Sequence, residues 1–120
     1  MTPRQRRNSN DPRLMITEDE SFETSNLWPK ETGLAHRVWI SVNVNHRHPR
    51  PQLRVESSDR RFYPLSLDEP VMFLAGRPPG LSGAQFKDLR RFVTLNREVL
   101  LAHWNDQISS MTAVNGIRHI

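Results

Sequence analysis

Residues 38–45 read VWISVNVN, and this stretch decides how the rest of the chain is interpreted. Branched aliphatic side chains alternate along it with Trp39, Ser41 and two asparagines. A two-residue period places alternate side chains on opposite faces of a β-strand, so one face of this strand is predicted to be buried. The side chains of that face are Val38, Ile40, Val42 and Val44. The chain is therefore expected to contain a small sheet with one covered face and one open face.

The next six residues, HRHPRP at 46–51, are predicted to be a solvated, cationic connection between two strands. Its two prolines lack the backbone N–H that a sheet needs, so they end the first strand. Alternating patterns follow at 52–56 and 63–67, and a short apolar piece at 71–75 is expected to add one more strand. These segments predict an antiparallel meander of three or four strands.

Two helices are predicted after the strands. Ser82 and Gln85 form a capping box, in which the serine hydroxyl accepts from the amide of residue 85 and the glutamine side chain returns to the amide of residue 82. Apolar residues at helical spacing follow, and Asn96 is expected to cap a second helix from Arg97 to about Ile108. The apolar stripes of both helices would cover one face of the sheet, which gives an α+β fold.

The chain is predicted to divide into three parts. Residues 1–33 lack a sustained period and contain three prolines, so they are predicted to be an arm that is disordered or depends on a partner for order. Residues 34–110 are expected to form the α+β domain. Residues 111–120 are expected to be a C-terminal tail whose apolar side chains could pack back on the domain.

The composition excludes several classes of protein and site. The chain has no cysteine, so it has no disulfide, no thiolate metal site and no cysteine nucleophile. No apolar run is long enough to cross a bilayer and no secretory signal is recognised, so a cytoplasmic protein without membrane contact is expected. The formal net charge is +4, and only Lys30 and Lys87 among 17 basic side chains are lysines. Guanidinium groups suit phosphate and carboxylate partners, and no cofactor is expected.

The arginines are the candidate binding residues. They lie on the second predicted strand and its flanking turns: Arg47, Arg50, Arg54, Arg60 and Arg61. The rings of Trp39 and Phe62 could stack on bases or on a protein partner. In the alternative interpretation, Trp39 is half-buried and the arginines pair with neighbouring glutamates and aspartates.

The histidines suggest a second, catalytic hypothesis. His46 and His48 would project to the same side of an extended backbone. With an arginine to stabilise a phosphorane, they could serve as the acid and base of a metal-independent ribonuclease. A metal site would need a third ligand, which His36, His103 or His119 could supply only through the fold. No catalytic or metal-binding residue is assigned, and the sequence favours a protein that is not an enzyme.

Residues 95–105 read LNREVLLAHWN and look like the closing helix leu-his-arg-glu-glu-leu-leu-x-x-trp of a known family. The region from Val38 to about Ile108 resembles this family of small bacterial proteins, which are often found on phages and other mobile elements. Its members are classed as a domain of unknown function and carry a Pro-His-Phe-His-Val signature. In this chain PQLRV stands at 51–55, so both signature histidines are absent. Gln52 and Arg54 at those places cannot shuttle protons near neutral pH.

Some relatives are found beside antitoxin-like genes, so the resemblance implies a role in a toxin–antitoxin module. Together the residues and the resemblance favour a small non-catalytic interaction protein of mobile-element type. It would bind through its arginine-rich strand and turns. A protein partner is favoured over nucleic acid, and the number of copies in the assembly is left open.

Overall fold

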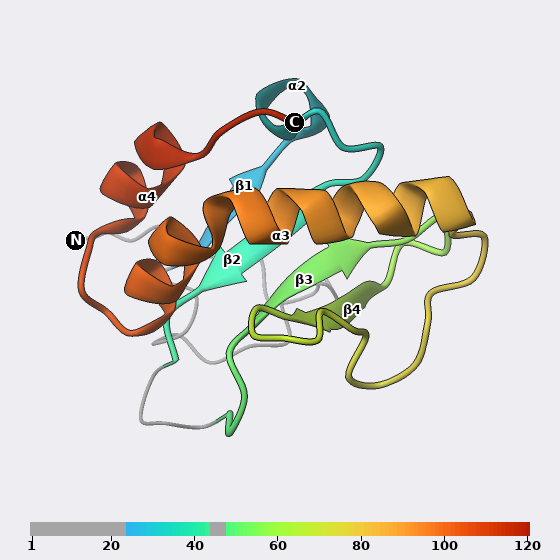
Figure 1. Cartoon of the computed structure of the whole chain (residues 1–120), viewed down its shortest axis with the longest axis horizontal. Helices are drawn as coiled ribbons and strands as arrows, with labels where there is room; N and C mark the ends of the chain where they lie inside the picture. Colours follow the sequence, from blue (N-terminus) through green and yellow to red (C-terminus); the bar gives the residue numbers. More distant parts are fainter. Residues whose placement is uncertain (1–23, 44–47) are drawn as a thin grey trace, which may run out of the picture.

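The computed structural model describes residues 24–43 and 48–120. The described strands form one antiparallel sheet in the order β1-β2-β3-β4, and α3 lies across one of its faces (Figure 1). The elements are β1 (Thr24–Leu27), α2 (Pro29–Thr32), β2 (Val38–Ser41), β3 (Gln52–Glu56), β4 (Phe62–Ser66), α3 (Gly83–Trp104) and α4 (Ser110–Gly116). The predicted fold class, an α+β meander with C-terminal helices, is confirmed.

The hydrophobic core lies between the sheet and α3. Val38 of β2 faces Val55 of β3, and Leu53 of β3 faces Leu65 of β4, and all four side chains are buried. The α3 side chains packed into the same core are Leu89, Phe92, Val93, Leu100 and Trp104. Full burial of one such side chain stabilises the fold by about 1.5–3 kcal/mol. The alternation seen in the sequence is therefore the pattern of a sheet that is covered on one side.

The first strand of the sheet is one that the sequence did not predict. The predicted arm extended to residue 33, but Thr24–Leu27 pairs with β2 and Leu27 is fully buried. The one-turn helix α2 then begins with Pro29 and ends at Thr32, and it is capped by Gly33, whose φ of 83° suits glycine. The predicted boundary at residue 34 is therefore wrong for residues 24–33, because four residues are too few to show a period. The rest of the predicted arm lies outside the described residues.

The helices differ from the prediction in their boundaries. The capping box is confirmed, since Ser82 Oγ accepts from the amide of Gln85 and Gln85 Oε1 accepts from the amide of Ser82, both at 3.0 Å. However, α3 continues as one helix to Trp104, and Asn96 lies buried inside it instead of capping a second helix. The predicted strand at 71–75 is only a single bridge, between Leu65 and Phe73.

The predicted C-terminal tail is folded onto the domain. Residues 110–116 form α4, in which Ala113 is fully buried. The amide of Ile120 donates to the carbonyl of Thr32 at 2.9 Å, so the end of the described chain reaches α2, and the two meet in Figure 1. Val114, Ile117 and Ile120 pack against the core, as the sequence allowed.

Candidate binding surface on the open face of the sheet

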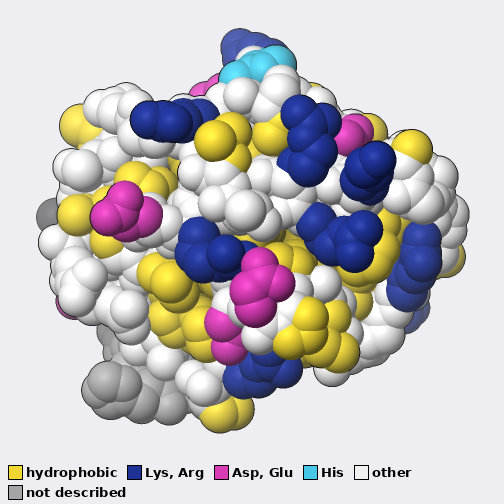
Figure 2. Space-filling model, viewed as in Figure 1, with side chains coloured by type: hydrophobic (Ala, Val, Ile, Leu, Met, Phe, Trp, Pro, Cys, Tyr) yellow, Lys and Arg dark blue, Asp and Glu magenta, His cyan; other side chains and the backbone are white. Residues whose placement is uncertain are grey.

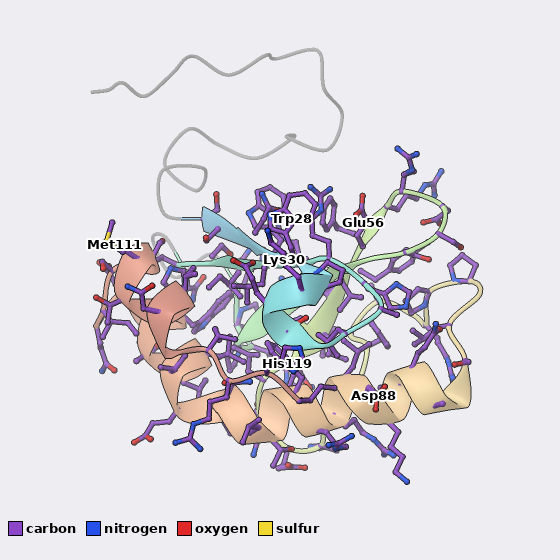
Figure 3. The ribbon with its side chains drawn as sticks, turned by 90° about the horizontal axis from the view of Figure 1, so that it is seen from above. Trp28, Lys30, Glu56, Asp88, Met111 and His119 are labelled. Atoms are coloured by element: carbon purple, nitrogen blue, oxygen red, sulfur yellow. The ribbon has the colours of Figure 1, made fainter. Side chains whose placement is uncertain are left out.

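The open face of the sheet, on the side away from α3, carries aromatic and charged side chains. Trp39 of β2 is paired in register with Arg54 of β3, and Glu56 of β3 with Phe62 of β4. Because their neighbours along the strands are buried under α3, these side chains point the other way. Figure 3 shows Trp28 and Glu56 on this side, whereas Asp88 lies on α3 at the opposite side. The strand period therefore brings cations and rings from three strands onto one surface.

Two arginines and three aromatic rings on this face form an aromatic–arginine stack. The Arg37 guanidinium carbon lies 4.9 Å from the ring centroid of Trp28 and 5.2 Å from that of Phe62. The rings of Phe62 and Trp39 are 5.3 Å apart, and Arg54 lies 5.6 Å from the Trp39 ring. Such cation–π contacts contribute about 0.5–1 kcal/mol each when exposed and more when desolvated. The stack holds its rings in fixed positions.

Arg37 is anchored by Glu56. Its Nε donates to Glu56 Oε1 at 3.1 Å and its Nη2 donates to Oε2 at 2.9 Å, which is the bidentate geometry that suits a guanidinium and a carboxylate. The two side chains are only 13% and 19% exposed. The carboxylate therefore neutralises Arg37, which acts as a rigid support for the rings.

A shallow pocket of about 510 Å³ lies at one end of the stack, beside the β3–β4 turn. It is lined by Trp28, Ala35, His36, Arg37, Glu56, Ser57, Ser58 and Arg60. His36 Nδ1 donates to the carbonyl of Glu56 at 3.1 Å, since a carbonyl oxygen can only accept. Its Nε2 is then an acceptor, and this buried atom has no partner within the described part of the chain. The pocket combines an exposed tryptophan with the cationic groups of Arg37 and Arg60.

The β3–β4 turn carries an arginine in a backbone conformation that favours glycine. Arg60 has a φ of 68° and its amide donates to the carbonyl of Ser57 at 2.9 Å. Left-handed backbone is uncommon for residues other than glycine, asparagine and aspartate. In the same turn a hydrogen bond from the Tyr63 hydroxyl lowers the pKa of Asp59, so this carboxylate stays ionised beside Arg61.

The predicted binding arginines are distributed along β3. Arg50 pairs with Asp68 at 2.9 Å near one end, and Arg54 lies over Trp39 in the middle. Arg60 and Arg61 are exposed on the turn at the other end, and Arg47 lies outside the described residues. Trp39 is only 7% exposed, so its ring is packed within the stack. The pairing of Arg50 and the burial of Trp39 agree with the alternative interpretation.

Three residues of this surface were not among the predicted binding residues: Trp28, His36 and Arg37. Trp28 was assigned to the arm. It is followed by Pro29, which favours the start of a helix, and by Gly33, which favours its end, and this spacing indicates local order. Arg37 lies two residues before Trp39, and extending the strand period by one step would have placed both on the same face.

The described histidines do not converge. His36 lies in the pocket, and His119 lies beside Gly33 at the end of the chain. The backbone of His48 is held by the Asn43 side chain through bonds of 2.9 and 3.0 Å, and its ring centroid is 6.0 Å from that of Trp104. His46, the other histidine of the catalytic hypothesis, lies outside the described residues. Within 24–43 and 48–120 no group of three or more His, Asp or Glu side chains could hold a metal ion.

His103 is expected to make stability depend on pH. It is fully buried, and its Nε2 shares a hydrogen bond of 2.8 Å with Ser110 Oγ. Burial lowers the pKa of His103, although Asp106 opposes the shift. The unfolded chain therefore binds a proton that the folded chain excludes, so stability is complete above about pH 6.5 and falls as the pH drops below it.

Urea unfolding at about pH 8 and pH 5 measures this effect. The wild-type chain should lose more stability between the two pH values than a His103→Gln variant, by up to about 1.4 kcal/mol per pH unit within the window. Equal losses in the two proteins would show that His103 is not the linked group.

No protein-family model, curated protein or solved structure gives a match to this chain. None of the helices in the described part of the chain is long and apolar enough to cross a membrane.

Proposed function

We propose that this chain is a small non-catalytic interaction protein that binds its partner through the open face of the sheet and the β3–β4 turn. The observation that carries the proposal is the solvent exposure of Trp28. The residue is 47% exposed although Arg37 lies 4.9 Å from the ring centroid. An exposed aromatic side chain that is held in place by its neighbours contributes binding area with little loss of conformational entropy.

The charges of this face support the same proposal. Arg60 is exposed and forms no ion pair with any described residue. Arg61 is exposed beside it on the same turn. A partner with anionic groups would meet these guanidinium groups at the end of the stack.

The arrangement of the described histidines favours binding over catalysis. An acid and a base must reach the same reacting group, at about 2.6–3.2 Å or through one water. His36 bonds to the carbonyl of Glu56 beside the β3–β4 turn, whereas His103 is fully buried and bonds to Ser110 at the start of α4. A role in a phage or toxin–antitoxin module is part of the proposal, and it comes from the family resemblance described above.

Affinity purification of the tagged chain from its native host tests the proposal. The test variant is Arg54→Ala/Arg60→Ala on the open face, and the control is Lys87→Ala/Arg118→Ala, which removes the same charge elsewhere. Figure 2 shows that the α3 side also carries Lys and Arg side chains, so a general charge effect would weaken both variants. We expect a stoichiometric partner that is lost with the first variant and kept with the control.

Two results would contradict the proposal. The first is a partner that both variants retain or that both lose. The second is a nuclease activity of the purified chain that is abolished by His46→Ala/His48→Ala, because that result would support the ribonuclease hypothesis instead.

A further inference from the structure

The exposed indole of Trp28 is suited to stacking on a flat ring. Arg37 occupies one side of the indole, at 4.9 Å from the ring centroid, while 47% of the residue remains exposed. Arg37 itself is fixed by two hydrogen bonds to Glu56. The indole is thus held by a rigid support and still has surface available for another π-system. Nucleobases stack on such side chains without regard to sequence, because every base has a π-face.

The guanidinium of Arg60 supplies an anion-binding group beside this indole. Both residues line the same pocket of about 510 Å³. Arg60 has no ion-pair partner among the described residues, and its φ of 68° is one that glycine would adopt without strain. An unfavourable backbone conformation that is kept with a charged side chain at the rim of a pocket points to a use for that side chain.

His36 also lines the pocket, and its Nδ1 donates to the carbonyl of Glu56 at 3.1 Å. The exposed aromatic residue and the exposed arginine of the pocket are Trp28 and Arg60. A π-face and an anionic group are therefore the two features that a ligand of this pocket should have.

We infer that the pocket between Trp28 and Arg60 binds one nucleotide of a single-stranded nucleic acid, with the base on the indole and the phosphate at the guanidinium. This inference rests on the proposed function and names the class of partner. The neighbouring nucleotide would lie over the same face of the sheet, where Phe62 is partly exposed.

Other polyanions fit this surface less well. An acidic peptide could pair with Arg60, but its carboxylates would leave the indole without a flat partner. A duplex keeps its bases stacked inside, so none would reach Trp28. A second basic hollow of about 460 Å³ on α3 is lined by Lys87, Arg90, Arg91, Thr94, Leu95 and Ile120. It contains no aromatic side chain, and Arg91 there already pairs with Asp88 at 3.5 Å.

Fluorescence anisotropy with a short labelled oligothymidylate tests the inference on the full chain. Trp28→Ala should weaken binding by about 5- to 150-fold, since stacking of one base accounts for that range. Trp28→Phe keeps a ring and should recover most of the affinity, which separates loss of stacking from loss of folding.

Arg60→Gly tests the phosphate contact without a loss of stability. It should weaken binding and make the plot of log affinity against log salt concentration shallower by about 0.7, the value for one phosphate of a single strand. The control is Asp106→Gly, because Asp106 also has a positive φ, 60°, but lies at the end of α3 away from the pocket. Both variants should have a melting temperature equal to or above that of the wild type, and only Arg60→Gly should bind more weakly.

Several results would overturn the inference: no binding of the oligonucleotide, equal binding by Trp28→Ala, a preference for duplex of the same length, or equal competition by a free nucleoside monophosphate. Binding of a glutamate-rich peptide in place of the oligonucleotide would also overturn it, yet the proposed function would survive with a protein as the partner. If the purification experiment also failed, the proposed function itself would be rejected.

Discussion

Asn96→Leu is expected to lower the free energy of unfolding by about 2–4 kcal/mol, because it leaves main-chain groups of the C-terminal segment without partners. Asn96 is 3% exposed in the middle of α3. Its Oδ1 accepts from the amide of Arg118 at 2.7 Å, and its Nδ2 donates to the carbonyl of Arg118 at 3.1 Å. One side-chain amide thus pairs with both main-chain groups of a residue 22 positions away. Leucine has a similar volume but can form neither bond.

The consequence extends beyond Arg118. The amide of Ile120 donates to the carbonyl of Thr32, which connects the same segment to α2. Loss of the Asn96 bonds should therefore loosen the contact between the C-terminal segment and α2. Urea unfolding measures the change, and Leu95→Ala is the control because Leu95 is 44% exposed on the adjacent position and should change stability by no more than about 0.5 kcal/mol. An Asn96→Leu protein as stable as the wild type would mean that these bonds contribute nothing.

Arg37→Ala is expected to cost about 2–3 kcal/mol of stability and to release the ring of Trp28. The substitution leaves the carboxylate of Glu56 with little solvent, since that side chain is only 19% exposed, and removing one partner of a buried pair is strongly destabilising. It also removes the guanidinium between Trp28 and Phe62.

Arg50→Ala is the matched control for this prediction. Arg50 pairs with Asp68 at the same distance of 2.9 Å, but the two side chains are 40% and 44% exposed. Exposed pairs contribute about 0–1 kcal/mol. A second check is Arg37→Ala/Glu56→Gln, which should recover part of the loss because no charge is then left unpaired. Equal effects of Arg37→Ala and Arg50→Ala would show that burial does not distinguish the two ion pairs.

Local patterns in the sequence were sufficient to predict most of the fold. The alternation of β2 and β3 and the capping box at Ser82 depend only on neighbouring residues. The structure has β3 and the capping box where the sequence indicated, whereas β2 ends at Ser41 and the last two residues of the strand predicted at 38–45 lie outside the described residues. Asn96 was taken for a helix cap because asparagine favours caps in the absence of a tertiary partner. Its partner, Arg118, is distant in sequence, so no local pattern could reveal that Asn96 stays inside one helix.

The binding surface was predictable only in part, for the same physical reason. The strand period predicts the outward position of Arg54, and the turn-forming residues Ser57-Ser58-Asp59 predict that Arg60 lies in a turn. The position of Trp28 depends on the pairing of Leu27 with Val38, which joins β1 to β2. A four-residue strand with one inward aliphatic side chain gives no signal of that pairing, so the indole and its contact with Arg37 emerge only from the fold.

The most direct test of the account is a proton–nitrogen correlation spectrum of the full chain titrated with oligothymidylate. The chain has three tryptophans, so its spectrum contains three indole N–H signals. Trp28 lies on the open face, whereas Trp104 is buried in the core at the end of α3. The proposed binding mode predicts that the indole signal of Trp28 and the amides of the β3–β4 turn shift while the indole signal of Trp104 does not. Shifts confined to Trp104 and the amides of α3, with Trp28 unchanged, would contradict it.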